Sequence, residues 1–291
     1  APNAARIPKR PYGNTGIELS VIGYGGINVK EIEQKTANLY VARAVERGVN
    51  YFDVAPGYGD AEIQLGPALA PYRKDCFLAC KTHARDRATA EMEFARSLER
   101  LRTDHFDLFQ LHAITDMQKD IEPIFKKGGV MEMLIEKKKA GQIRFLGFSA
   151  HSVEAAFAAM DRYDFDSALF PINFAATYKG GFGPQIIQRT QEKNVARLAL
   201  KAMACQRFTD NKDPRRKFLK TWYEPLTDPE EMSMALRWTL NQPVTAAIPP
   251  GEEVWFRHAL DIASGPLDIT EDEVSYLKQK ARGLVPIFTR A

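Results

Sequence analysis

Four polar side chains in the sequence have the types that acid catalysis on a carbonyl group needs. Asp53 and Tyr58 lie five residues apart in the segment 49–59, VNYFDVAPGYG. Lys81 and His112 each end a later apolar run. A nearby ammonium lowers the pKa of a phenol, so Lys81 is expected to make Tyr58 a better proton donor. Asp53 would offset the cost of burying Lys81, and His112 would donate to a substrate carbonyl or orient it.

The segments that must position these residues alternate between buried strands and amphipathic helices. Strands rich in β-branched and aromatic residues are predicted at 49–54, 76–82 and 106–111. Eight such strands, each followed by a helix, are typical of a (β/α)8 TIM barrel, an α/β fold. The carboxyl ends of its strands form one rim, so the four side chains are expected to meet there. The other five strands are predicted at 19–26, 143–149, 167–174, 196–203 and 244–248.

Four segments fall outside this repeat. A β-hairpin is predicted over 10–21, with its turn at Asn14 to Gly16, and it would close one end of the barrel. A long polar stretch, 206–228, interrupts the rhythm before the last strand. Extra C-terminal helices are predicted over 254–263 and 271–282. The whole chain, 1–291, is therefore predicted to be a single barrel domain.

A doubly wound sheet is the competing architecture. Its nucleotide site usually has a G-x-G-x-x-G turn after the first strand, with the third glycine packing a helix closely against that strand. Here the turn contains Gly23 and Gly25, but Asn28 stands at the third position. A second glycine-rich segment, 179–184, lacks the Lys-Ser/Thr ending of a phosphate-binding loop. Both observations favour the barrel.

The composition excludes several kinds of partner. A formal net charge of +3 is too small to indicate nucleic acid or an anionic membrane. No apolar run approaches the roughly 20 residues that span a bilayer, so a soluble, cytoplasmic protein is expected. Export after removal of a leader stays open, because the sequence begins at Ala1. Cys76 and Cys80 are interpreted as buried thiols, and no histidine pattern predicts a metal site.

With these residues in view, the chain resembles the aldo-keto reductase superfamily over nearly its whole length. The superfamily's Asp-x(4)-Tyr pattern matches Asp53 and Tyr58, its strand-three Lys matches Lys81, and its strand-four His matches His112. The resemblance implies a (β/α)8 barrel that transfers a hydride from a nicotinamide cofactor to an aldehyde or ketone. It also implies that Tyr58 is the general acid, Lys81 modulates its pKa, Asp53 pairs with Lys81, and His112 orients the carbonyl.

The resemblance also implies cofactor-binding positions, several of which differ from the family pattern. Gly25 and Gly26 match small residues after strand one, and Ser149 matches a carboxamide ligand, although Ala150 replaces the expected Asn. Asn173, or Pro171, stands where a Gln is expected, and Lys201, or Leu200, where a Tyr stacks on the nicotinamide. The phosphate-binding segment after strand eight reads IPPGEE, which leaves Gly251 and, beyond it, Arg257. Asp53 completes the predicted cofactor set.

These matches lead to one preferred function and one alternative. The preferred function is an NAD(P)H-dependent carbonyl reductase that uses NADP by family likeness. NAD is the alternative cofactor, because the family's phosphate-binding Lys is missing and the carboxylates of Glu252 and Glu253 stand nearby. The alternative function is a cofactor-binding regulatory or accessory barrel with little turnover. The partner is a small-molecule carbonyl substrate, and the oligomeric state stays open. The predicted pocket residues are Ile27, Tyr58, His112, Phe174, Tyr178, Phe182, Trp222 and Tyr223.

Overall fold

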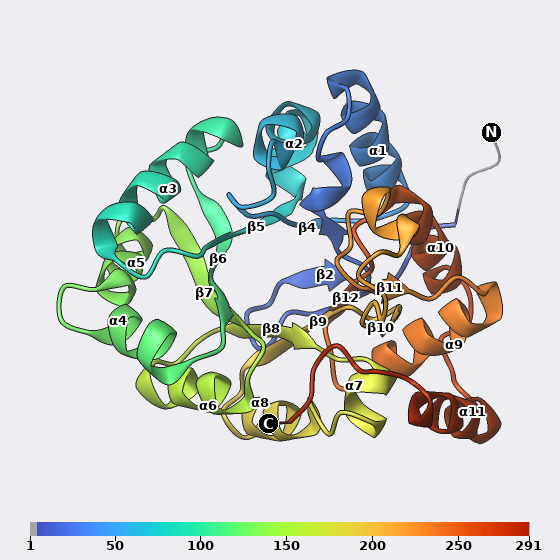
Figure 1. Ribbon diagram of the computed structural model, residues 1–291. Helices are drawn as coiled ribbons and strands as arrows, with labels where there is room; N and C mark the ends of the chain where they lie inside the picture. The colour runs from blue at the N-terminus through green and yellow to red at the C-terminus, as the bar shows by residue number, and fades with distance from the viewer. Residues whose placement is uncertain (1–4, 291) are drawn as a thin grey trace.

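A computed structural model describes residues 5–290, so the predicted domain bounds, 1 and 291, lie outside the described residues. Eight parallel strands form the central sheet, and a bridge between Ile22 and Ala247 joins its first and last strands into a barrel. Helices surround the strands (Figure 1), which confirms the predicted (β/α)8 fold. In sheet order the strands are β3 (Tyr24–Gly25), β4 (Tyr51–Asp53), β5 (Phe77–Thr82), β6 (Phe106–Ile114), β7 (Ile143–Ala150), β8 (Ser167–Pro171), β9 (Ala196–Leu200) and β12 (Ala246–Ile248).

The helices cover the outside of the barrel. Many begin at a side-chain cap, as at Asp86, whose carboxylate accepts a hydrogen bond from the backbone N–H of Thr89. The longer helices are α1 (Gln34–Glu46), α2 (Ala61–Leu69), α3 (Arg87–Arg100), α5 (Val130–Lys139), α6 (Val153–Arg162), α8 (Pro184–Glu192), α9 (Pro229–Leu240), α10 (Glu253–Ala263) and α11 (Glu271–Arg282). The short ones are η1 (Gly26–Val29), η2 (Ala70–Asp75), η3 (Met117–Ile121), α4 (Glu122–Phe125), α7 (Phe174–Tyr178) and η4 (Pro214–Lys217).

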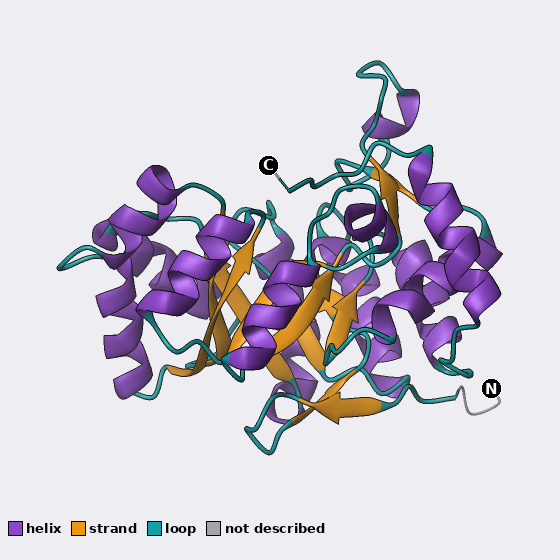
Figure 2. Cartoon of the chain, turned by 90° about the horizontal axis from the view of Figure 1, so that it is seen from below, coloured by secondary structure: helices purple, strands orange, loops and turns teal. Residues whose placement is uncertain are grey.

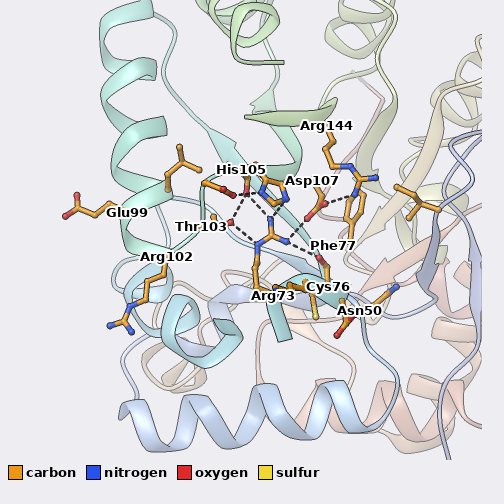
Figure 3. Close-up of a pocket in the computed structure, with 15 residues that line it drawn as sticks. Asn50, Arg73, Cys76, Phe77, Glu99, Arg102, Thr103, His105, Asp107 and Arg144 are labelled. Atoms are coloured by element: carbon orange, nitrogen blue, oxygen red, sulfur yellow. Dashed lines mark hydrogen bonds and ion pairs between the residues drawn. The ribbon is translucent and has the colours of Figure 1, made fainter. Parts of the chain in front are cut away.

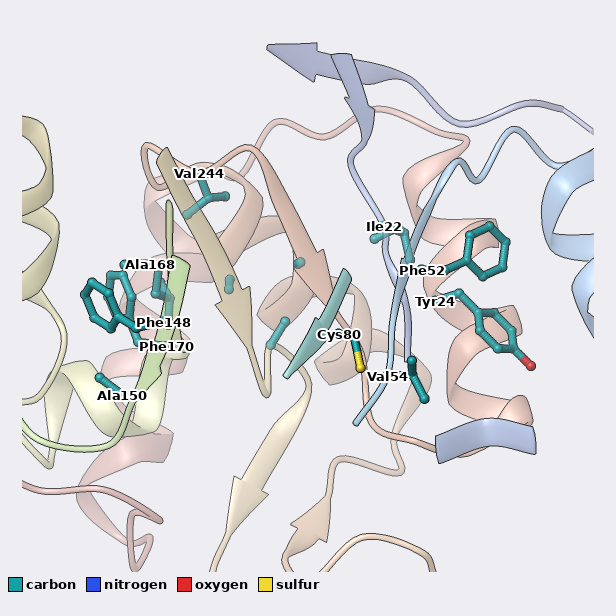
Figure 4. Packing of buried hydrophobic residues seen from close by; sticks show 14 of the residues in the cluster. Ile22, Tyr24, Phe52, Val54, Cys80, Phe148, Ala150, Ala168, Phe170 and Val244 are labelled. Carbon is teal, nitrogen blue, oxygen red and sulfur yellow. The ribbon is translucent and has the colours of Figure 1, made fainter. Parts of the chain in front are cut away.

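The alternation of side chains along each strand divides the core in two. Phe52, Val54 and Cys80 belong to the large cluster that includes the apolar faces of the helices (Figure 4). Tyr51 and Ala79, one residue earlier on β4 and β5, belong to a second cluster inside the barrel. Polar residues that share the inward parity therefore project into the barrel, and those near the carboxyl ends of the strands reach its rim.

The predicted N-terminal hairpin is present and closes the opposite end of the barrel. Strands β1 (Lys9–Pro11) and β2 (Glu18–Ser20) pair antiparallel, and Figure 2 shows them below the main sheet. Tyr12 is fully buried and contacts the edges of Phe77 and Phe145, at ring-centroid distances of 5.1 and 5.4 Å. Its hydroxyl donates a 2.7 Å hydrogen bond to Ser167 Oγ at the start of β8. The amino end of the barrel is thus filled by packed side chains.

Several predicted boundaries were wrong, and each error has a local cause. Residues 121–140, whose sequence pattern predicts one helix, form the two helices α4 and α5, because the chain turns at Lys126 to Gly129, where Gly128 has a φ of +70°. Strand β9 ends at Leu200 because Lys201 leaves the extended conformation, with a φ of +58°. Strand β8 ends before Asn173, whose side chain caps α7. The polar stretch contains a small antiparallel sheet of β10 (Ala204–Gln206) and β11 (Glu224–Pro225).

Candidate active site

A cavity of about 330 Å³ opens at the carboxyl ends of the barrel strands. Its wall includes Asp53 from β4, Tyr58 from the following turn, Lys81 from β5 and His112 from β6. The four residues that sequence analysis singled out are therefore brought together. Strand register explains the meeting, because β5 pairs with both β4 and β6, with Asp53 opposite Ala79 and Lys81 opposite Gln110.

Lys81 and Asp53 form an ion pair in the interior. Their residues are 1% and 3% exposed, and Lys81 Nζ donates a short hydrogen bond to Asp53 Oδ1. The same ammonium lies 3.4 Å from the Tyr58 hydroxyl and 3.4 Å from the carbonyl oxygen of Val54. Burial opposes the charge on Lys81, but the Asp53 carboxylate and the Tyr58 phenol outweigh it and raise the pKa of Lys81. Lys81 is therefore a fixed cation beside Tyr58.

Gln110 is a member of this group that sequence analysis missed. It is fully buried, and its Nε2 donates a 2.9 Å hydrogen bond to Asp53 Oδ2. Asp53 thus has an ammonium on one carboxylate oxygen and an amide on the other. The sequence does contain a sign of this role. Gln110 stands two residues before His112 on the same strand, and side chains two residues apart on a strand face the same side.

Tyr58 has a raised pKa in this structure. Burial raises it more than the neighbouring Lys81 ammonium lowers it. The expectation that Lys81 brings the phenol below its ordinary pKa is therefore wrong for the protein without substrate. The ammonium offsets only part of the cost of burial, and Tyr58 carries its proton at neutral pH.

His112 lies in an irregularity of β6. The register between β6 and β7 shifts between Leu111 and Ile114, and Ala113 has a φ of +53°. Ser149 Oγ accepts a 2.7 Å hydrogen bond from the backbone N–H of Ala113 and so holds this irregularity. Such irregularities re-aim side chains next to active sites. Here the His112 ring is turned edge-on to Tyr58, with 5.9 Å between the ring centroids.

The His112 imidazole is electrically neutral. Burial lowers its pKa well below the ordinary value, and the Lys81 ammonium lowers it further. Its Nδ1 atom is buried with no hydrogen-bond partner among the described residues. His83, which sequence analysis did not single out, stacks on the His112 ring at a centroid distance of 3.7 Å. A neutral imidazole held between two rings is suited to donating one hydrogen bond to a substrate oxygen.

The predicted cofactor positions divide into two groups. Gly25, Ser149, Lys201 and Gly251 line the cavity, as does Asp53. Gly26, Asn173 and Arg257 are not part of its wall. Gly26 packs against Val54, where a Cβ would approach Val54 Cβ to 2.8 Å. Asn173 Oδ1 accepts a hydrogen bond from Ala176 N, and Arg257 is exposed on α10.

The predicted pocket residues also divide. Ile27, Tyr58, His112, Trp222 and Tyr223 line the cavity, whereas Phe174, Tyr178 and Phe182 do not. The three absent aromatic residues belong to α7 or the segment after it, and each packs with the helices outside the barrel. The strand carrying Phe174 was predicted to continue toward the rim, but it ends at Pro171.

A larger cavity, of about 980 Å³, lies near the amino ends of β5 and β6 (Figure 3). The Arg73 guanidinium donates to Asp107 Oδ2 at 2.9 Å, to Thr103 Oγ1 at 3.0 Å and to the carbonyl oxygen of His105 at 2.9 Å. Arg144 donates to the other Asp107 oxygen at 3.0 Å. These charged groups satisfy one another, as expected for the end of a barrel that contributes to stability.

No cluster of metal-ligating side chains occurs within residues 5–290. Over the same residues, the helices include none with the length and apolar character to cross a membrane. The cavity wall at the rim offers the Tyr58 phenol, the Asp53 carboxylate, the three lysines Lys81, Lys201 and Lys220, several imidazoles and small residues as its chemical groups.

A (β/α)8 barrel with an Asp, Tyr, Lys and His group at its carboxyl rim defines a class of oxidoreductases. The chain belongs to the aldo/keto reductase family, whose sequence model matches residues 21–280. This confirms the resemblance found from the sequence.

Individual relatives agree with this assignment. Aldo-keto reductase YhdN of Bacillus subtilis is 34% identical over 161 residues, which cover 48% of this chain and 46% of that protein. L-galactose dehydrogenase of Arabidopsis thaliana is 28% identical over 174 residues, covering 54% and 53%. The chain thus matches about half the length of these relatives. Aldo-keto reductase AKR11C1 from Bacillus halodurans, in its holo form, has the same fold, with a TM-score of 0.74 and 20% identity over 98% of this chain and all of that one, 100%.

Removing the Lys81 charge should destabilise the protein strongly. The Lys81→Met variant leaves the Asp53 carboxylate buried without its cation, so the free energy of unfolding should fall by about 3–5 kcal/mol. Urea denaturation at neutral pH measures this loss. The double variant Asp53→Asn, Lys81→Met should recover much of it, because no charge is then left unpaired.

Lys138→Met is the matched control. Its ion pair with Asp166 is partly exposed, so its loss should cost no more than about 1 kcal/mol. Equal destabilisation by Lys81→Met and by the double variant would contradict the buried-charge account.

Proposed function

We propose that this protein reduces a small-molecule aldehyde or ketone to an alcohol, with a nicotinamide cofactor as hydride donor. One observation carries the proposal: Lys81 Nζ lies between the Asp53 carboxylate and the Tyr58 hydroxyl in a cavity that His112 also lines. In this arrangement a phenol that holds its proton stands beside a permanent positive charge. That combination suits a proton donor whose conjugate base must be stabilised only after the proton has left.

The cavity residues fit a nicotinamide cofactor. Gly25 and Gly251 line the wall without side chains, and a Cβ on Gly251 would approach Ile27 Cγ2 to 2.1 Å. Ser149 Oγ accepts a hydrogen bond from the backbone N–H of Ala113. The hydroxyl proton of Ser149 is therefore free to donate to a carboxamide oxygen. When bound, the cofactor supplies the hydride; Gly25, Ser149 and Gly251 would hold it against the reacting carbonyl.

The chain's own residues would handle the proton. Tyr58 and His112 would donate hydrogen bonds to the carbonyl oxygen and orient it. Negative charge develops on that oxygen as its carbon is reduced, and the Tyr58 proton moves to it. The phenolate that remains is stabilised by Lys81, and Asp53 holds Lys81 in place through its other contacts. Such preorganised charges act most strongly where water is excluded.

We further propose that NADP is preferred, with NAD as the weaker cofactor. By family likeness, the N-terminus of α10 is expected beside the adenosine ribose. Burial raises the pKa of Glu253 at that helix end to about 7, against the lowering effects of Arg257, Arg43 and Lys220. Near neutral pH this carboxylate is therefore partly protonated, while three cations surround it. A helix N-terminus with excess positive charge favours a 2′-phosphate.

Replacing the proposed acid should abolish most turnover while keeping the cofactor. The Tyr58→Phe variant should lose about 10²–10⁴-fold in kcat for aldehyde reduction, the usual contribution of a general acid. Absorbance of the reduced nicotinamide measures turnover, and tryptophan fluorescence measures the cofactor Kd, which should change little.

Tyr40→Phe, a partly buried position on α1, is the matched control and should keep its activity. Full activity of Tyr58→Phe would remove Tyr58 from its role. Tight cofactor binding with only very slow turnover by the wild type, over a broad aldehyde panel, would instead favour the accessory barrel.

The nucleotide preference can be tested at Arg257. The Arg257→Gln variant should raise the Kd for NADPH by about tenfold, because a charge-assisted hydrogen bond to phosphate is lost. The Kd for NADH, which lacks that phosphate, should change less than about twofold. Arg282→Gln, at an exposed position on α11, should change neither. Equal weakening of both nucleotides, or tighter binding of NADH by the wild type, would contradict the preference.

A further inference from the structure

Lys201 is a cation in the catalytic cavity that the proposed chemistry does not use. It directly follows strand β9 and lines the same cavity as Tyr58, Lys81 and His112. Its backbone φ of +58° lies in the left-handed region, which non-glycine residues seldom adopt. Strain of this kind persists where the surrounding structure holds a residue in one position. The side chain is therefore anchored at the cavity wall.

Three aromatic rings surround the Lys201 ammonium. Its Nζ lies 5.5 Å from the ring centroid of Trp222, 5.8 Å from that of Tyr223 and 5.4 Å from that of Phe288. Trp222 and Tyr223 come from the polar stretch, and Phe288 comes from the C-terminal segment, which runs past α7 in Figure 1. Cation–π contacts stabilise an ammonium and fix its position, but they do not neutralise its charge.

The Lys201 charge has no acidic counterpart among the described residues. Burial and, to a smaller extent, the Lys81 ammonium together lower its pKa to about 8, and no carboxylate acts against them. Lys81, by contrast, has Asp53 as its partner. At neutral pH most Lys201 side chains are still protonated, since the pH is below this pKa. The cavity wall thus carries an unmatched positive charge.

A second cavity, farther from the reacting groups, carries further positive side chains. It has a volume of about 510 Å³ and shares His151 and Trp222 with the catalytic cavity. Among the described residues, its wall includes Arg207 and Arg216 and no carboxylate. The only acidic residue of the catalytic cavity wall is Asp53, which Lys81 already neutralises. An elongated ligand leaving the catalytic cavity on this side would pass these two arginines.

We propose that Lys201 binds an anionic oxygen group of the ligand and that the enzyme prefers carbonyl substrates carrying a carboxylate. The inference rests on the proposed carbonyl reduction and names its substrate class. The aromatic rings hold the ammonium in place before the ligand arrives, and the incoming anion supplies the missing counter-charge. A phosphate oxygen of the cofactor could pair with Lys201 in the same way. The experiment must therefore distinguish a substrate carboxylate from a cofactor phosphate.

The test compares two aldehydes of equal chain length, 4-oxobutanoate and butanal, on the wild type and on Lys201→Met. The ratio of kcat/KM for 4-oxobutanoate to that for butanal should fall about tenfold or more in the variant, the loss expected for a hydrogen bond to a charged group. Lys201→Arg, which keeps the charge, should retain most of the ratio. The ratio cancels any general loss of activity that both aldehydes share.

Lys212→Met, at an exposed position of the same polar stretch, controls for the lost charge and should keep the wild-type ratio. If the anion belongs to the cofactor, the ratio will stay constant in Lys201→Met while the Kd for the cofactor rises about tenfold. An unchanged ratio together with an unchanged cofactor Kd would overturn the proposal.

A binding measurement separates this inference from the proposed function. Fluorescence of Trp222, close to Lys201, should report binding of 4-hydroxybutanoate to the wild type and its loss in Lys201→Met, even if no aldehyde is turned over. Wild-type protein that binds 4-hydroxybutanoate but reduces neither aldehyde would refute the proposed reduction and keep the anion site. Reduction of both aldehydes with no effect of Lys201→Met in any assay would refute the anion site alone.

Discussion

The ion pair between Lys81 and Asp53 is the interaction on which the carboxyl rim of the barrel depends. An ammonium that is 1% exposed is stable inside a barrel only if a carboxylate lies against it. Asp53, on the neighbouring strand β4, supplies that carboxylate. Gln110, on β6 at the other side of β5, donates a hydrogen bond to the second oxygen of Asp53. Three adjacent strands are thereby fixed relative to one another. The Tyr58 hydroxyl, 3.4 Å from the same ammonium, takes its place from this arrangement.

The barrel separates this rim from the end that contributes to stability. At the amino end, Tyr12 of the hairpin fills the interior, and Arg73 and Asp107 satisfy each other's charges. At the carboxyl end, groups stay partly unsatisfied: Lys201 has no acidic partner, and the Nδ1 atom of His112 has no hydrogen bond among the described residues. Unsatisfied polar groups in a cavity are costly unless a ligand completes them. Lys201 and His112 both line the cavity at the carboxyl rim, where a ligand would complete them.

The sequence was sufficient for the barrel and for Asp53, Tyr58, Lys81 and His112, because these residues stand where apolar strands end. It was insufficient for Gln110 and His83, whose importance depends on the register between strands and on the stacking of two rings. The end of β9 was misplaced because nothing in the sequence marks the left-handed conformation of Lys201. The raised pKa of Tyr58 was missed because the cost of burial depends on packing that only the folded chain has.

The central claim, that this rim reduces carbonyl groups with a hydride from a nicotinamide, has a direct test. Purified protein would be given an aldehyde and a cofactor deuterated at the hydride-donating carbon of its nicotinamide, and the alcohol would be analysed by mass spectrometry. The account predicts an alcohol that carries one deuterium on the former carbonyl carbon and is therefore about one mass unit heavier than the unlabelled alcohol, with the hydroxyl proton coming from solvent through Tyr58. An alcohol formed without deuterium at that carbon would contradict it.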